Sequence, residues 1–233
     1  MKQKWSSFLL ASIVTLGALS GRPALGQSPS AAPSPAALPE PSASEIADRV
    51  QAFYDRTTVF KADFQQRYWV KAYDKTKDSR GQVIFKKPGK MSWRYTNNGN
   101  RVVSDGVVVK VYERDARQMY EQQLKDSQYP AALSFLTGGA KLKQEFSLRK
   151  LNARDLRFEG GYVLEAEPKQ PTAAYQKLLL FIDGRTAQVR RVLLLDAQGN
   201  RNRFDFESPV VNARVPDSEF TFQPPPGTQI IKP

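Results

Sequence analysis

The chain has 233 residues with no histidine and no cysteine, and its formal net charge is +12. Without these two residue types the usual zinc site, a cysteine nucleophile, a Ser-His-Asp triad and any disulfide framework are excluded. Chemistry carried by carboxylates alone stays open, but most enzyme classes lose the side chains on which they depend.

The first 26 residues have the three parts of a secretory signal peptide. A basic start at 1–4 is followed by an apolar run at 5–19, and Ala24-Leu25-Gly26 supplies the small residues that a signal peptidase requires. The apolar run is shorter than the roughly 20 residues that span a bilayer, and an uncleaved N-terminal anchor is the alternative. We expect residues 1–26 to be removed and the protein to be exported and soluble.

The next part, 27–43, consists almost wholly of serine, alanine, proline and glutamine. Such a composition buries too little apolar surface to offset the entropy lost on ordering, so it predicts a flexible tether. Residues 44–233 have a length that suits a single domain with its own core.

Basic residues concentrate in one block, since residues 67–117 hold thirteen lysines and arginines against five acidic residues. Nucleic acid is not expected as a partner of an exported protein. A phosphate-bearing lipid surface or an acidic protein suits this block better, and an ordinary solvated sheet face is the alternative.

The first expected element of the domain is a helix. Ser42 with Glu45 three residues later has the capping-box pattern, or Ser44 caps the helix directly. Four apolar residues then recur at helical spacing and form one stripe that must pack on something: Ile46, Val50, Phe53 and Tyr54. The helix is expected to end near Thr57.

From residue 60 the apolar pattern changes to a period of two, which is typical of strands with one buried face. The strand at 60–70 places Phe60, Ala62 and Phe64 on its apolar face. Further strands are expected at 82–87, 90–96, 101–104, 107–114, 117–124, 156–159, 162–167, 176–183, 189–196, 202–207 and 220–222.

Turn signals separate several of these strands. Pro88-Gly89, Asp183-Gly184 and Gln198-Gly199-Asn200 mark turns. Asp105-Gly106, between two valine-rich runs, predicts a type I′ hairpin turn, which requires positive φ at both central residues.

Between the two groups of strands, Pro130 and Gly138 delimit a short apolar helix. Leu133 and Leu136 share one side of this helix, and Phe135 lies out of phase with them. Together the elements predict a mainly β fold of the α+β class, in which about ten antiparallel strands curve around two short helices and so hide the apolar face of the sheet.

Two carboxylates are the strongest candidates for catalysis. Glu165 and Glu167 lie two apart on an expected strand, so they share a face and could flank a bond or hold a hard cation. The simpler interpretation is the solvent side of a strand. An exported carboxylate-dependent hydrolase is therefore an alternative, and it requires one of the two in a cleft with a raised pKa.

Aromatic and methionine side chains offer a second candidate site. Met91, Trp93 and Tyr95 alternate along one strand and project to one face. Phe60, Phe64 and Tyr68 do the same on theirs. Two interpretations fit this pattern, namely plain core packing and a concave apolar pocket of a size for acyl chains. The pattern does not separate them.

Five segments, in this order, carry a resemblance to a known family. They are Phe60-x-Ala62-x-Phe64-x-Gln66, the run Lys86-Lys87-Pro88-Gly89-Lys90-Met91-Ser92-Trp93-Arg94-Tyr95, Val103-Ser104-Asp105-Gly106 through Tyr112, Asp196-x-x-Gly199-Asn200, and Phe220-Thr221-Phe222-x-Pro224-Pro225-x-Gly227. Over most of 46–231 the chain resembles the LolA-type outer-membrane lipoprotein carriers of the periplasm.

The resemblance implies an incomplete, highly curved antiparallel β-barrel of about ten to eleven strands, with short helices as a lid over an apolar concavity. It implies a periplasmic chaperone, not an enzyme, that needs no cofactor and no metal ion. The implied cargo is the acyl chains of lipoproteins, carried from the inner to the outer membrane by a monomer. The implied partners are the inner-membrane lipoprotein-releasing ABC transporter and the outer-membrane lipoprotein receptor, which is itself a lipoprotein and needs a cysteine that this chain lacks.

The family also implies which residues bind acyl chains or hold the lid. By position they are Phe60, Phe64, Lys87, Met91, Trp93, Tyr95, Leu133, Phe135 and Leu136. Lys87 departs from the family, which usually has an arginine that holds the lid by hydrogen bonds. Because lysine is a flexible point donor and arginine a rigid fork, Lys87 is expected to hold the lid less firmly. Met91 stands where the family often has phenylalanine and makes a softer wall.

Two further functions share this fold. One is a periplasmic sensor that detects lipids or mislocalised lipoproteins and signals to a membrane partner. The other is a specialised carrier of a different amphiphile, such as a glycolipid or a polyketide.

Overall fold

The computed structural model describes residues 40–126 and 141–232. The short helix expected at 130–137, with Leu133, Phe135 and Leu136, lies outside the described residues. None of the described helices is long and apolar enough to cross a bilayer.

Twelve strands form a single sheet within the described residues, in the order β12-β6-β5-β4-β3-β2-β1-β11-β10-β9-β8-β7. Every neighbouring pair is antiparallel except β12 and β6, which are parallel, so the mainly β fold class is confirmed. The strands are β1 Val59–Val70, β2 Lys75–Lys86, β3 Lys90–Tyr95, β4 Arg101–Asp105, β5 Val108–Glu113, β6 Gln118–Gln123, β7 Phe146–Leu151, β8 Gly161–Pro168, β9 Lys177–Asp183, β10 Val189–Leu195, β11 Arg201–Val211 and β12 Gln229–Ile231.

Among the described helical elements only α1 is longer than four residues. They are α1 Ala43–Asp55, α2 Leu142–Glu145 and the 3-10 turns η1 Lys71–Tyr73, η2 Leu124–Asp126 and η4 Asp217–Phe220. Helix α1 begins at the expected capping box, where the Ser42 hydroxyl accepts from the Glu45 amide and the Glu45 carboxylate accepts from the Ser42 amide. Its apolar stripe is buried, as the spacing predicts.

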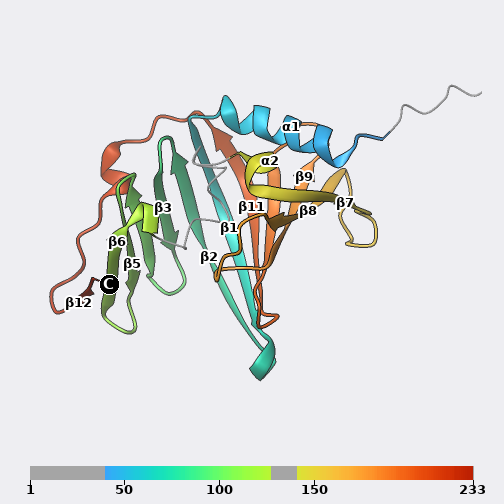
Figure 1. Ribbon diagram of the computed structural model, residues 1–233. Helices are drawn as coiled ribbons and strands as arrows, with labels where there is room; N and C mark the ends of the chain where they lie inside the picture. Colours follow the sequence, from blue (N-terminus) through green and yellow to red (C-terminus); the bar gives the residue numbers. More distant parts are fainter. Residues whose placement is uncertain (1–39, 127–140, 233) are drawn as a thin grey trace, which may run out of the picture. The chain divides into compact units, whose positions relative to one another are not determined.

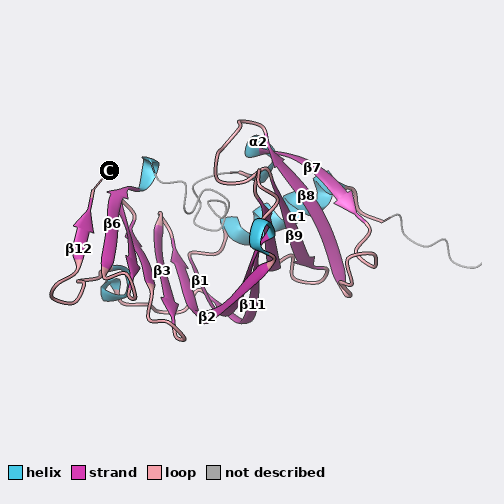
Figure 2. Cartoon of the chain, turned by 90° about the horizontal axis from the view of Figure 1, so that it is seen from below, coloured by secondary structure: helices cyan, strands magenta, loops and turns pink. Residues whose placement is uncertain are grey.

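The sheet bends into an arc, and α1 lies across the upper ends of its strands on the inner side (Figures 1 and 2). A long pair, β1 and β2, stands in the middle and extends well beyond the helices (Figure 1). The two ends of the arc, β7 and β12, do not pair with each other. The arrangement is therefore an incomplete barrel.

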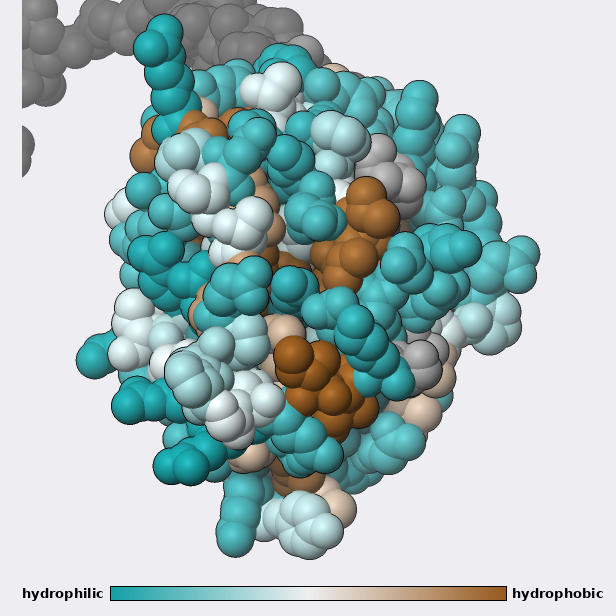
Figure 3. Space-filling view, turned by 90° about the vertical axis from the view of Figure 1, so that its left-hand side faces the viewer, coloured by the Kyte–Doolittle hydropathy of each residue, from teal (hydrophilic) through white to brown (hydrophobic). Residues whose placement is uncertain are grey.

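The main core lies on the inner side of the arc, where α1 and side chains from most of the strands form one cluster. Two smaller clusters lie outside it, one around Val59, Ile84 and Phe220, and one around Val163, Leu179 and Phe181. On the side that carries β6 and β12, hydrophobic residues reach the surface only as separate patches among hydrophilic ones (Figure 3). The inner, apolar face of the sheet is covered by α1, whose buried side chains belong to the main core.

Two expected strands are wrong. Residues 156–159 lie at and just after the end of a turn at 153–157. The Phe158 amide donates to the Ala153 carbonyl, and Leu156 and Phe158 pack on the outer cluster around Val163. Residues 220–222 form no strand: Phe220 is the last residue of η4 and packs on Val59 and Ile84, and residues 221 and 222 follow in no regular element.

Three strand segments were not expected. The polar half of β2 at 75–81 has no apolar period, and it forms a strand because β1 supplies its pairing partner. Strand β7 pairs with β8, and the three residues of β12 pair with β6. In each case the segment has no clear strand pattern of its own, and the neighbouring strand supplies the backbone hydrogen-bonding partners that make it a strand.

The turn at Asp105-Gly106 joins two strands as expected, but it is not of type I′. Only Gly106 has a positive φ, of 100°. The Asp105 carboxylate accepts from the amides of Val107 and Val108, both at 2.8 Å. This carboxylate therefore closes the turn in place of a second positive-φ residue.

Candidate functional site

The inner face of the sheet carries a dense group of rings, which we call the aromatic cluster. Its members come from β1, β2, β3 and β11 and are all buried: Phe60, Phe64, Phe85, Trp93, Tyr95, Phe204 and Phe206. Because side chains alternate between the two faces of a strand, every second residue of each strand contributes. The rings are neighbours because strands far apart in the chain pair, with Phe64 of β1 opposite Phe206 of β11.

A glycine permits the close approach of two of these rings. Gly81 lies opposite both Phe64 and Tyr95 in the neighbouring strands. A Cβ added at Gly81 would stand 3.0 Å from the Phe64 ring and 1.9 Å from the Arg94 carbonyl oxygen. With no side chain there, the Phe64 and Tyr95 rings meet edge to face with their centroids 5.0 Å apart.

The structure brings together five of the nine residues predicted for the site, which belong to the main core: Phe60, Phe64, Met91, Trp93 and Tyr95. Phe64 and Trp93 are in edge-to-face contact at 4.9 Å between centroids. Sequence reasoning missed Phe85, Phe204 and Phe206, although Phe204 and Phe206 alternate on an expected strand and so carried the signal. Leu133, Phe135 and Leu136 lie outside the described residues.

Helix α1 fills the space in front of this face. Its five buried side chains belong to the same core as the aromatic cluster: Ile46, Ala47, Val50, Phe53 and Tyr54. The open grooves among the described residues include one of about 1380 Å³ beside β7 and β8, one of about 500 Å³ over β1, β2 and β11, and one of about 260 Å³ beside β11. The first two hold no member of the aromatic cluster, and the third is lined by Phe206 together with mostly polar residues. In this state the packing of the α1 side chains on the sheet covers most of the apolar face.

Lys87 fastens the C-terminal end of α1 to the turn between β2 and β3. Its ammonium group donates to the carbonyl oxygens of Tyr54 and Asp55, the second at 3.3 Å. They belong to the last turn of a helix that holds no basic residue of its own there, and the Tyr54 carbonyl also accepts from the Thr57 amide at 3.1 Å. A cation there also complements the negative end of the helix dipole. The predicted latch residue therefore contacts α1.

Other polar contacts tie α1 to its surroundings. The buried Tyr54 hydroxyl accepts from the Val189 amide of β10 at 3.2 Å, and burial raises the pKa of Tyr54. Lys143 of α2 forms an ion pair with Asp48 at 2.7 Å. Before the helix begins, Glu40 pairs with Lys150 of β7 at 2.6 Å. The helix is thus held by an apolar stripe and a small number of separate polar contacts.

The second candidate site, the two carboxylates of β8, is not a catalytic pair. Glu165 is 8% exposed, and it accepts from Arg149 at 2.7 Å and from Lys177 at 3.2 Å. Lys177 also bonds Glu167 at 3.2 Å. Burial raises the pKa of Glu165, but the bonds from Arg149 and Lys177 outweigh it and hold this pKa below the ordinary 4.5. A carboxylic general acid needs a raised pKa, which Glu165 lacks, and Glu167 is exposed instead of lying in a cleft. Neither carboxylate therefore has the setting that the hydrolase alternative requires.

This ion-paired carboxylate predicts a pH-dependent contribution to stability. Glu165→Gln is expected to lower the free energy of unfolding by about 1–3 kcal/mol at neutral pH, because charged hydrogen bonds are lost. Because the pKa of Glu165 is lower in the folded protein, its contribution to stability is fully present above the unfolded pKa near 4.5. This contribution is lost as the pH falls through the folded-state pKa. Urea titrations of both proteins at several pH values check this. An equal difference at neutral and strongly acidic pH would contradict it.

Comparison with known proteins matches most of the chain to one family. The model of the family "Outer membrane lipoprotein carrier protein LolA" matches residues 55–223. The outer-membrane lipoprotein carrier protein of Cupriavidus pinatubonensis is 27% identical over 189 residues, covering 79% of this chain and 86% of that protein. The carrier of Bordetella pertussis is 31% identical over 153 residues, covering 65% and 70%.

A solved structure has a similar fold. It is an uncharacterized conserved protein from Thermus thermophilus, with a TM-score of 0.50 and 14% identity. The match covers 82% of this chain and 99% of that one. At this identity the likeness concerns the fold alone.

Proposed function

Because the chain belongs to the LolA family of outer membrane lipoprotein carrier proteins, we propose that it holds the acyl chains of a lipoprotein against the inner face of its sheet. The proteins of this family are periplasmic carriers and not enzymes. The observation that supports the proposal most is a continuous aromatic face covered by the amphipathic helix α1, because an apolar cover of this kind can be exchanged for another apolar ligand.

The proposed step is an exchange between α1 and the acyl chains. When α1 moves away, its buried side chains lose the sheet, and the acyl chains cover the aromatic cluster in their place. Burying one methylene contributes about 0.8 kcal/mol, so a lipid anchor has enough apolar surface to compete with the helix. The free energy spent on displacing α1 keeps the net affinity moderate, and a carrier needs this in order to release its cargo.

In this proposal Lys87 is the latch of the closed state, and Phe60, Phe64, Met91, Trp93 and Tyr95 form the wall that the acyl chains contact. Leu133, Phe135 and Leu136 are assigned to the lid from the sequence, and this assignment stays a prediction.

The remaining assignments follow from the family and the N-terminal sequence. We propose that residues 1–26 are a signal peptide, that 27–43 are a tether, and that one carrier domain, 44–233, follows. A monomer would receive its cargo from the inner-membrane lipoprotein-releasing transporter and deliver it to the outer-membrane receptor.

The direct test is to express the chain in a periplasm, purify it without detergent, and analyse the bound lipids by mass spectrometry. Lipoprotein or an acyl-bearing anchor that copurifies supports the carrier. An empty protein that also fails to take lipoprotein from isolated membranes contradicts it, and would turn attention to a sensor. Glycolipid as the only bound species would indicate a carrier of another amphiphile.

Removing the latch is expected to bias the exchange toward the open form. In Lys87→Leu the two helix carbonyls lose their charged donor, which costs the closed state about 1.5 kcal/mol, the lower end for such bonds because Lys87 is half-buried. A fluorescent diacylated lipopeptide should then bind roughly tenfold tighter and transfer more slowly to acceptor membranes. The matched variant Lys87→Arg keeps the donor and should not tighten binding. Unchanged binding and transfer in Lys87→Leu would show that Lys87 is no latch.

A further inference from the structure

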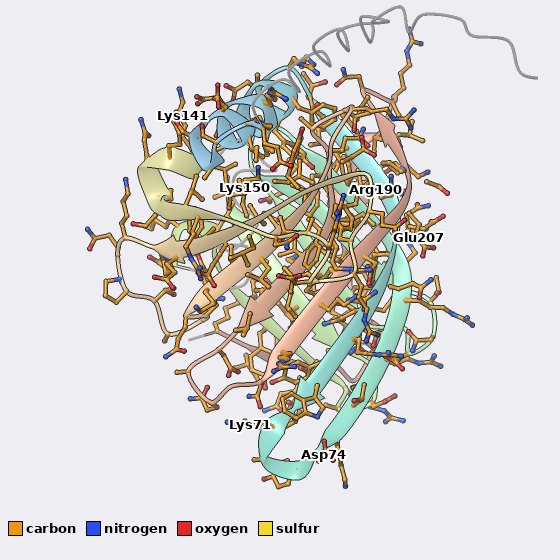
Figure 4. The ribbon with its side chains drawn as sticks, turned by 90° about the vertical axis from the view of Figure 1, so that its right-hand side faces the viewer. Lys71, Asp74, Lys141, Lys150, Arg190 and Glu207 are labelled. Atoms are coloured by element: carbon orange, nitrogen blue, oxygen red, sulfur yellow. The ribbon has the colours of Figure 1, made fainter. Side chains whose placement is uncertain are left out.

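The β1–β2 hairpin ends in an exposed turn far from the helices. Strand β1 runs into η1, and Asp74 in left-handed conformation, with a φ of 45°, returns the chain into β2. Figure 4 shows Lys71 and Asp74 at the free end of this hairpin, away from Lys141 beside α1. We call residues 69–77, together with Arg201 of the adjoining strand, the hairpin tip.

The hairpin tip is positively charged. Lys71, Lys75 and Lys77 are exposed, and none of them forms an ion pair with any residue that the structure describes. The one acidic residue in 69–77, Asp74, accepts a hydrogen bond from the Trp69 indole at 2.8 Å. Arg201 adds a fourth cation above the Trp69 ring, 5.2 Å from its centroid. The excess of cations is therefore available to an anion from outside.

An exposed aromatic side chain lies among these cations at the end of the hairpin tip. Tyr73 is 74% exposed, more than any other large hydrophobic residue among those described. A tyrosine ring with an apolar body and a polar hydroxyl suits the boundary between a hydrocarbon layer and water. Tyr73 lies between Lys71 and Lys75 in the chain, so its ring and the two ammonium groups would reach the same hydrocarbon–water boundary together.

The neighbouring β10–β11 turn braces the tip. The Asn200 side chain accepts from the Lys71 amide at 2.9 Å. Gly199, with a φ of 80°, leaves room for the Lys71 side chain, because a Cβ there would stand 2.9 Å from the lysine Cδ. A braced tip loses little conformational freedom when it binds, so more of the interaction energy is retained.

The cations surround the apex on both faces of the hairpin. Lys75 lies opposite Val70 and Lys77 opposite Tyr68, so these lysines share the face of the aromatic cluster. Arg201 lies opposite Trp69, on the other face. A stable complex with a protein partner buries roughly 800 Å² of surface on each side. A narrow, convex tip with its cations on both faces offers no single surface of that size. A lipid surface needs no matching shape.

We propose that the hairpin tip docks end-on to an anionic phospholipid surface, with the lysines and Arg201 on the lipid phosphates and the Tyr73 ring among the headgroups. This binding surface is separate from the proposed acyl site, at the other end of β1. It would hold a carrier at a membrane while cargo is exchanged.

The test is flotation of the full, exported chain with vesicles of phosphatidylcholine and phosphatidylglycerol in equal amounts, and with phosphatidylcholine alone. Binding is expected only to the anionic vesicles and should weaken with salt. Each lysine near such a surface strengthens partitioning roughly fivefold, so Lys75→Gln with Lys77→Gln should weaken it roughly 25-fold. The matched control, Lys125→Gln with Arg185→Gln, removes the same charge from exposed positions elsewhere and should change little.

Tyr73 is tested separately, because Tyr73→Ser should weaken binding and Tyr73→Trp should preserve it. Equal losses in the two double variants would overturn the proposal, as would binding to both kinds of vesicle alike or to neither. Uptake of a soluble lipopeptide, measured on the same variants, should be unaffected by the tip. Failure of that uptake in the unmodified chain would refute the acyl site and leave the tip result standing.

Discussion

Replacing Trp93 with alanine is expected to lower the free energy of unfolding by about 3–5 kcal/mol, the range for deleting a large buried ring. Trp93 is 3% exposed. Its ring contacts those of Phe64, Phe204 and Phe85, with centroids 4.9, 5.2 and 5.6 Å apart. Because rings from three other strands close around it, the cavity left by alanine cannot easily collapse.

Chemical denaturation of the purified variant measures this loss. Trp69→Ala is the matched control, since Trp69 lies in the hairpin tip, where the Arg201 guanidinium lies over its ring, and outside the main core. Its loss should stay near about 1 kcal/mol. A small loss for Trp93→Ala would contradict a closed, packed inner face and would favour a cavity that stands open without cargo.

Replacing Val50 with aspartate is expected to uncouple α1 from the sheet. Val50 is completely buried in the stripe that covers the aromatic cluster. An unpaired carboxylate at that position costs the closed state about 3–5 kcal/mol, which shifts the population of the open form by roughly 100-fold or more. A fluorescent fatty acid should bind the variant much more tightly, and the strand signal in circular dichroism should persist.

Arg49→Asp is the control on the same helix, because Arg49 is exposed and the substitution changes helix propensity and charge without touching the sheet. It should leave fatty-acid binding unchanged. Loss of the whole fold in Val50→Asp, with no gain of binding in Lys87→Leu, would mean that α1 is a permanent part of the core and not an exchangeable cover.

The local features of this protein are determined by the sequence. The capping box at Ser42 and Glu45 begins α1 where expected, because its two hydrogen bonds join residues three apart. The alternation of Met91, Trp93 and Tyr95 places them on one buried face, since successive side chains of a strand point to opposite sides. These interactions need only near neighbours, so the sequence predicts them.

Tertiary structure decided what those features meet. An apolar period of two predicts on which face of a strand a residue lies, but it does not predict which strand pairs beside it. The aromatic cluster therefore depends on β1 pairing with β11, which lies more than 130 residues further along the chain. The apolar residues at 156–159 have the composition of a strand but lie at and just after the end of a turn, whereas β7 becomes a strand because β8 offers an edge.

Lys87 illustrates the difference most clearly. The family resemblance predicts a latch, and the residue type supplies a donor, but its acceptors are carbonyls of Tyr54 and Asp55 on a helix 32 residues or more away. Hydrogen bonds of this kind depend on the position of the helix end, which is set by packing of the whole stripe against the sheet. The sequence alone determined which groups were available, and only the assembled fold determined which of them came within reach.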